Sequence, residues 1–255
     1  MTSKPSPEQQ GTIGALLDAS RRPGAVPVRR TFLQQGTQSH PKPGPLRDMV
    51  RAHDERAFDL YLLHRVVASS DPWDATRDAR IWARALGLPT PRDNGAAAVS
   101  KTWKRLDKSY HLVSRERRGR LAKVTSLLED GTGKPYASPT TAYFKVPFDY
   151  WTAEQAWYAT LSFPAKATLM IALSLQPPFL LPTEKAPKWY GLSTDTAERG
   201  LRELQDVGLL HRARKKRQDW LAGTSFSTEF RYTLQPPFAR ARLQRGSGHL
   251  TVVAS

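Results

Sequence analysis

The chain has 255 residues, a formal net charge of +16, a pI near 10.3 and 39% hydrophobic residues. That length fits one large or two small domains, and the charge favours a polyanionic partner, either nucleic acid or an anionic membrane. The absence of cysteine excludes disulfides, zinc fingers and a cysteine nucleophile. Because no apolar run reaches transmembrane length and the first residues lack a signal-peptide core, we expect a cytoplasmic protein.

The N-terminal segment, residues 1–45, is rich in Pro, Gly, Ser, Gln and Arg. This composition is typical of segments that bury too little apolar surface to fold, and Ile13–Leu17 is its one structured-looking patch. We therefore predict a disordered basic arm over residues 1–45. The other end, residues 239–255, carries closely spaced arginines and is predicted to be a flexible basic tail.

Residues 46–135 are predicted to form a first domain of three helices and a basic hairpin. The first helix has one face formed by Phe58, Tyr61, Leu62, Arg65 and Val66. The second helix ends at Gly87, because glycine commonly closes a helix in the left-handed conformation. After an unusually long polar turn comes a third helix with an apolar face of Val99, Trp103, Leu106 and Tyr110. The run Val113–Thr125 then favours a hairpin with a tight turn near Gly119.

Residues 136–238 show the same order of elements and are predicted to form a second domain. Pro164 marks the start of an apolar helix, Gly191 ends the next helix, and Ser193 is placed to cap the third. This third helix has an apolar face of Ala197, Leu201, Leu204 and Val207. A basic strand follows, and the alternation in Phe226–Leu234 predicts the strand that returns beside it.

Aromatic residues gather in Tyr143–Trp151, where the second domain begins. We interpret this run as a strand and connector that packs the two domains together, with a dimer interface as the alternative. Tryptophans fall on the apolar faces of the predicted helices, so we expect core packing rather than base stacking for Trp82, Trp103, Trp157 and Trp189.

The run from Trp189 to Leu210 reads WYGLSTDTAERGLRELQDVGLL, a helix end, a Gly-Leu turn and an amphipathic helix. It resembles the winged helix-turn-helix superfamily of bacterial DNA-binding regulators. Two such units on one chain are similar to the arrangement in plasmid replication initiators. The resemblance implies a mainly α fold with small β hairpins (α+β): two tandem winged-helix domains with disordered basic termini.

The third helix of the first domain carries a basic stripe opposite its apolar face. The residues expected to contact DNA from this helix are Ser100, Lys101, Lys104, Arg105 and Lys108. The hairpin that follows adds Arg115, Arg117, Arg118 and Arg120. The alternatives are an ordinary solvated helix face and a solubilising loop.

The second domain has a more mixed recognition helix. Its residues expected to contact DNA are Thr194, Thr196, Arg199 and Arg202. Glu198 and Glu203 oppose a purely electrostatic mode, so base readout and partner binding both stay open. The second hairpin adds Arg214, Lys215, Lys216 and Arg217.

These features predict a site-specific double-stranded DNA-binding protein, associated with the nucleoid or a plasmid, that regulates transcription or initiates replication of a mobile element. The excess of Arg over Lys fits phosphate and guanine recognition, and a GC-rich genome would give the same bias. A homodimer is compatible with this function. The alternatives are a winged-helix protein-interaction module in a chromosome or plasmid maintenance complex, and RNA binding.

Enzymatic motifs are weak in this sequence. There is no P-loop, no dinucleotide fingerprint and no pair of histidines at metal-ligand spacing. We therefore expect no catalytic residues, metal, cofactor, small-molecule ligand or membrane partner.

Overall fold

The computed structural model describes residues 4–37, 39–89, 94–152, 154–218 and 226–239. Of these residues 44% are helical and 23% lie in strands. The strands form small antiparallel sheets, so the fold is α+β with more strand than the mainly α class that the sequence predicted.

The chain begins with a folded N-terminal segment. It contains α1 (Pro7–Asp18), β1 (Ala25–Arg29), the 3₁₀ turn η1 (Arg30–Phe32), β2 (Gln34–Gly36) and β3 (Pro41–Pro43). Ser6 caps the start of α1, because its hydroxyl accepts a hydrogen bond from the backbone N–H of Gln9 at 3.1 Å. Apolar side chains of α1 and β1 are buried in the core: Ile13, Leu16, Leu17, Val26 and Val28.

The prediction of a disordered arm over residues 1–45 is therefore wrong. Its large apolar side chains from Ile13 to Leu33 stand at helix and strand spacing, so they reach the core while most polar residues stay outside. In addition β1 pairs antiparallel with β7 (Tyr143–Pro147), which lies far along the chain. Composition cannot reveal such a long-range pairing, which satisfies the backbone groups of the arm. The predicted tail lies outside the described residues from position 240 onward.

The middle of the chain contains α2 (Leu46–Arg51), α3 (Glu55–Val67), β4 (Asp74–Arg77), α4 (Ala79–Ala85), α5 (Asn94–Lys108), β5 (Val113–Arg118) and β6 (Leu121–Ser126). In the sheet of this region β6 lies between β4 and β5. Trp82 of α4 and Trp103 of α5 meet edge to face, with ring centroids 5.5 Å apart. The predicted core role is confirmed for Trp82, Trp103 and Trp157, which are buried, whereas Trp189 is half-buried.

The last part contains β7, α6 (Asp149–Thr152), α7 (Trp157–Thr160), α8 (Phe163–Ser174), η3 (Thr183–Lys185), α9 (Ala186–Tyr190), α10 (Thr194–Asp206), β8 (Leu210–Gln218) and β9 (Phe226–Leu234). Gly191 ends α9 with φ of 69°, and the Ser193 hydroxyl accepts from the N–H of Thr196 at 3.1 Å. These predicted helix ends are confirmed, as is the strand at Phe226–Leu234.

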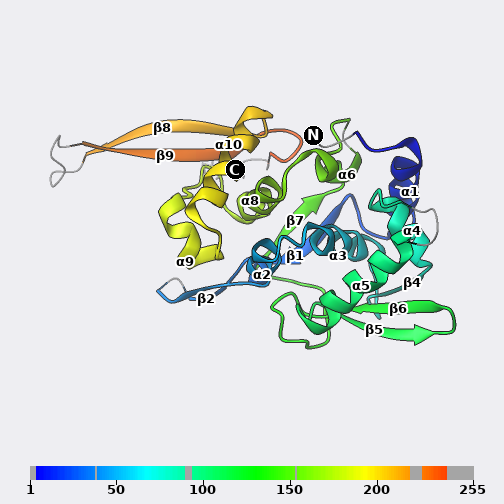
Figure 1. Ribbon diagram of the computed structural model, residues 1–255. Helices are drawn as coiled ribbons and strands as arrows, with labels where there is room; N and C mark the ends of the chain where they lie inside the picture. The colour runs from blue at the N-terminus through cyan, green and yellow to red at the C-terminus, as the bar shows by residue number, and fades with distance from the viewer. Residues whose placement is uncertain (1–3, 38, 90–93, 153, 219–225, 240–255) are drawn as a thin grey trace, which may run out of the picture.

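The prediction of two tandem winged-helix domains is wrong. The buried apolar residues form one cluster that runs from Ile13 to Phe238 instead of two separate cores. The β1–β7 pair joins the N-terminal segment to the second half at the centre of the molecule (Figure 1), and β3 packs against α9. Lys166 of α8 is 2% exposed, and its ammonium lies 2.7 and 2.8 Å from the carboxylates of Glu55 and Asp59 in α3. Local sequence patterns indicate the order of helices and hairpins. They do not show that the two halves share one core, because that depends on contacts between distant segments.

Helices α8 and α10 approach closely at Gly200. A Cβ on Gly200 would overlap the Thr168 hydroxyl and lie 2.6 Å from the carbonyl oxygen of Pro164. We expect Gly200→Ala to lower the free energy of unfolding by about 1–3 kcal/mol in urea denaturation, because the two helices must separate. The control is Gly14→Ala in α1, which meets no atom within 4 Å and should raise stability by about 0.5–1 kcal/mol. Equal effects of the two substitutions would contradict this close approach.

Candidate nucleic-acid interface

Helix α5 has one buried and one basic face, as its sequence predicts. Val99, Trp103 and Leu106 are buried, whereas Lys101, Lys104 and Lys108 are exposed. The Lys108 ammonium lies 3.2 Å from the carboxylate of Asp107, the acid that interrupts this face. Lys101 and Lys104 are therefore the exposed cations at the centre of the helix.

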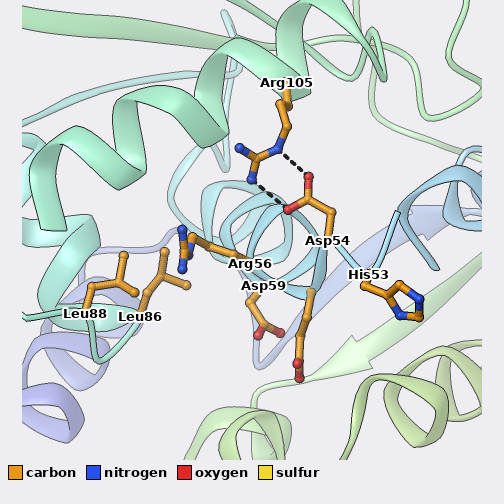
Figure 2. A pocket seen from close by; sticks show the side chains of 8 residues that line it. His53, Asp54, Arg56, Asp59, Leu86, Leu88 and Arg105 are labelled. Atoms are coloured by element: carbon orange, nitrogen blue, oxygen red, sulfur yellow. Dashed lines mark hydrogen bonds and ion pairs between the residues drawn. The ribbon is translucent and has the colours of Figure 1, made fainter. Parts of the chain in front are cut away.

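Arg105 does not belong to that exposed face. Its Nε and Nη2 donate to the two carboxylate oxygens of Asp54 at 2.6 and 2.7 Å (Figure 2). Asp54 also caps α3 and accepts a hydrogen bond from the Tyr110 hydroxyl at 3.1 Å. Burial raises the pKa of Asp54, but the hydrogen bonds and charge of Arg105, together with hydrogen bonds from the Tyr110 hydroxyl and the Ala57 N–H, hold that pKa below its usual value. The structure thus places Arg105 in a link between α5 and α3.

A groove of about 910 Å³ runs between α5, the start of α4 and the β5–β6 hairpin. Six basic residues line it, and they are Arg77, Arg80, Lys104, Arg115, Arg117 and Arg120. Two acids also line it, and both have partners. Asp78 accepts from the N–H of Arg80 at 2.8 Å, and Asp107 pairs with Lys108. With six basic residues against two acids, the lining of the groove is positively charged.

Arg115 fixes one wall of this groove to the other. Its guanidinium donates to the backbone carbonyl of Ser100 at 3.2 Å and to the Ser100 hydroxyl at 3.0 Å. Arg117 and Arg120 extend along the hairpin, with the Arg117 Nε donating to the carbonyl of Gly119 at 3.1 Å. Arg118 is exposed on the same hairpin but does not line the groove.

Sequence reasoning missed Arg77 and Arg80. They belong to β4 and α4, and they reach the groove because β4 pairs with β6 of the hairpin. No local pattern near these two arginines signals a binding role. The available signal was the position of a strand next to a basic hairpin, which only the sheet pairing shows.

A second groove of about 500 Å³ lies between α10 and the β8–β9 hairpin, and its charge is balanced. Glu198, Arg202 and Asp206 line it from α10, and Arg212 lines it from β8. Of the other predicted residues on α10, Thr194 and Arg199 are exposed, and the Thr196 hydroxyl hydrogen-bonds that of Ser193. The Arg199 guanidinium lies 3.8 Å from the carboxylate of Asp195. The exposed face of α10 therefore does not concentrate positive charge.

Glu203 of α10 has a structural contact. Its carboxylate accepts a hydrogen bond from the backbone N–H of Ser162 at 2.7 Å and another from the Ser162 hydroxyl. Ser162 is the cap of α8, so Glu203 joins α10 to the start of that helix. This contact explains why the predicted recognition helix carries an acid at position 203: Glu203 has a structural role and needs none in DNA binding.

The β8–β9 hairpin carries the second basic cluster. Arg214, Lys215 and Lys216 are exposed on β8, and the Arg214 guanidinium donates to the Thr228 hydroxyl at 3.3 Å. Arg217 pairs with Ser227 in the sheet register, and its side chain lies outside what the structure describes. The four predicted basic residues of this hairpin are thus consecutive in a strand rather than in a loop.

A pocket of about 440 Å³ beside α3 gathers His53, Asp54, Glu55, Asp59 and Arg105 (Figure 2). Its carboxylates have cationic partners, because Asp54 binds Arg105 while Glu55 and Asp59 bind Lys166. Across the described part of the chain, no three His, Asp or Glu side chains are grouped in a way that could hold a metal ion. This pocket therefore consists of structural ion pairs.

The helices of the described residues include none with the length and apolar content needed to cross a bilayer. Among the described residues, exposed basic side chains gather on one face of α5 and on the β5–β6 and β8–β9 hairpins. Comparison of the chain with protein-family models, curated proteins and solved structures finds no match.

Proposed function

We propose that this chain binds double-stranded DNA in the groove between α5 and the β5–β6 hairpin. The observation that carries the proposal is the lining of that groove, with six basic side chains and two acids that already have partners. Phosphate neutralisation by such side chains supplies most of the affinity of proteins for duplex DNA. The alternative of a protein-interaction module gives no reason for so one-sided a charge.

The dimensions of α5 also suit a DNA duplex. Helix α5 has 15 residues and is therefore about 22 Å long, and the major groove of DNA, about 12 Å wide, accepts a helix. Lys101 and Lys104 point away from the core on this helix, while the β5–β6 hairpin reaches out beside it. Together they can contact a base-pair edge and the neighbouring phosphates.

We propose further that binding is site-specific and serves transcription regulation or replication initiation of a mobile element. Association with the nucleoid or a plasmid would follow from this function. In-vivo footprinting separates the two roles. Repeated protected sites at an origin indicate initiation, whereas isolated sites at promoters indicate regulation.

Replacing Lys101 and Lys104 together by Ala should weaken DNA binding by roughly tenfold and reduce its salt dependence. Each lost phosphate contact lowers the slope of log Kd against log salt by about 0.9, so the pair should lower it by roughly 2. Fluorescence anisotropy with a random 30-bp duplex at increasing KCl concentration measures both quantities.

The matched control replaces Lys134 and Lys145 by Ala, because these lysines are also exposed but belong neither to α5 nor to the lining of the groove. It should bind like the unmodified protein. An unchanged slope in the Lys101/Lys104 variant would contradict the assignment of α5. Absence of any binding to duplex DNA at micromolar protein and low salt would instead favour a protein-interaction module.

A further inference from the structure

The β8–β9 hairpin forms a long ribbon that projects from the body of the protein (Figure 1). Each strand has nine residues, which at about 3.4 Å per residue gives a length of roughly 30 Å. The ribbon is anchored at its base, where Leu210, Tyr232 and Leu234 are buried and Phe179 forms an isolated bridge with Tyr232. The rest of the ribbon therefore extends away from the core as a separate arm.

Both faces of this ribbon carry positive charge. Side chains alternate along a strand, so Arg212, Arg214 and Lys216 lie on one face and Lys215 lies on the other. Arg231 is opposite Ala213 and shares the face of Lys215. The contacts agree with this division, because Arg212 covers the ring of Phe230 and Arg214 binds Thr228, both on the first face.

Negative charge on the described part of the ribbon is confined to Glu229. Its carboxylate accepts a hydrogen bond from the Nε of Arg231 at 2.9 Å, so this acid is neutralised. By contrast, α10 exposes Asp195, Glu198 and Asp206 beside Arg199 and Arg202. A phosphate row is therefore attracted to either face of the ribbon but has no net attraction to the helix.

We infer that the ribbon enters the major groove of duplex DNA edge-on, with one row of phosphates against each face, while α10 stays off the DNA. This inference rests on the proposed function and specifies how the second half of the chain contributes to it. A two-stranded ribbon fits the major groove, and side chains on both faces give it a thickness near 10 Å against a groove width of about 12 Å. A ribbon that lay flat on the sugar-phosphate backbone of DNA would need positive charge on one face only.

Lys215 and Lys216 provide a matched test, because they are adjacent, exposed and of one residue type but lie on opposite faces. We expect Lys215→Glu and Lys216→Glu each to weaken binding to a 30-bp duplex by roughly tenfold and to lower the salt slope by about 0.9 or more. Arg199→Glu on α10 should change neither quantity by more than about twofold. Circular dichroism checks that all three variants remain folded.

The outcomes separate this inference from the proposed function. Loss of binding with only one of the two lysine variants would show a ribbon lying flat and would overturn the inference. A larger loss with Arg199→Glu than with either lysine variant would also overturn it. If the Lys101/Lys104 variant is weakened while both ribbon variants bind normally, the ribbon is not an interface but α5 still is. If none of these substitutions affects binding, the proposed DNA-binding site on α5 is wrong as well as the ribbon.

Discussion

Glu129→Gln is expected to lower the free energy of unfolding by about 3–5 kcal/mol, because it leaves a buried guanidinium without a counter-charge. Glu129 and Arg65 are both fully buried, with the Arg65 Nη2 lying 3.5 Å from one carboxylate oxygen of Glu129. The other oxygen accepts a hydrogen bond from the Nη1 of Arg29 at 2.6 Å. Gln keeps the shape of the side chain, removes its charge and turns one accepting oxygen into a donor, so the loss reports electrostatics and hydrogen bonding rather than a cavity.

Arg65 has few alternatives once Glu129 is neutral. Its guanidinium lies 3.8 Å from the ring centroid of Tyr136, and its Nη2 donates to the carbonyl of Pro27 at 3.2 Å. Its Nε and Nη1 are buried without a hydrogen-bond partner in the structure. The Arg65 charge therefore cannot reach water without opening the contact between α3 and the segment that contains Tyr136.

Urea denaturation of Glu129→Gln and of a surface control measures this effect. The control is Asp48→Asn, which breaks the exposed ion pair between Arg47 and Asp48 and should cost less than about 1 kcal/mol. Adding Arg65→Met to Glu129→Gln should restore part of the stability, since the buried charge is then gone. A loss for Glu129→Gln as small as that of the control would mean that Arg65 does not need this carboxylate.

The elements with clear local signals could be predicted from the sequence. Ser193 and Gly191 mark the ends of helices through their own backbone chemistry, and the alternation in Phe226–Leu234 marks a strand. The basic face of α5 was also visible, because Lys101 and Lys104 stand opposite the buried residues of one helix. Each of these features depends on neighbours within one or two turns.

Long-range features could not be predicted. The polar composition of residues 1–45 concealed β1, whose partner β7 begins at Tyr143. The bidentate contact between Arg105 and Asp54 joins two helices, so spacing along α5 could not distinguish Arg105 from the exposed lysines. Arg77 reaches the groove only through the pairing of β4 with β6. Sequence patterns thus identified the basic helix and hairpin but not which of their charges are already neutralised.

His64 should make the stability of this protein depend on pH between about 4 and 6.5. Its ring is fully buried against Trp82 and Trp103, and its Nε2 donates to the carbonyl of Val124 at 3.0 Å. Burial lowers the pKa of His64 to about 4, although the hydrogen bond to Val124 opposes this and the nearby charge of Arg65 adds to it. The folded protein therefore holds a neutral imidazole at pH 7.

The sign of the effect follows from the two pKa values of His64. Below pH 6.5, the pKa of His64 in the unfolded chain, the unfolded chain binds a proton at this residue. The folded protein does not bind that proton until the pH falls to about 4. Stability from this residue is thus complete above pH 6.5 and is lost as the pH falls through about 4. At 1.36 kcal/mol for each pKa unit, the loss is about 3 kcal/mol.

The measurement compares the free energy of unfolding of the unmodified protein and of His64→Gln from pH 4 to 7.5. Gln can still donate to the Val124 carbonyl but does not titrate, so its packing cost is constant with pH. The difference between the proteins also cancels Asp59, whose pKa burial raises to about 6 and whose contribution has the opposite sign. We expect the advantage of the unmodified protein over His64→Gln to shrink by about 3 kcal/mol on acidification. His64 joins α3 to Trp103 of α5 and to Val124 of β6, so both walls of the basic groove lose this support at acid pH. A stability difference between the two proteins that does not change with pH would refute this role of His64.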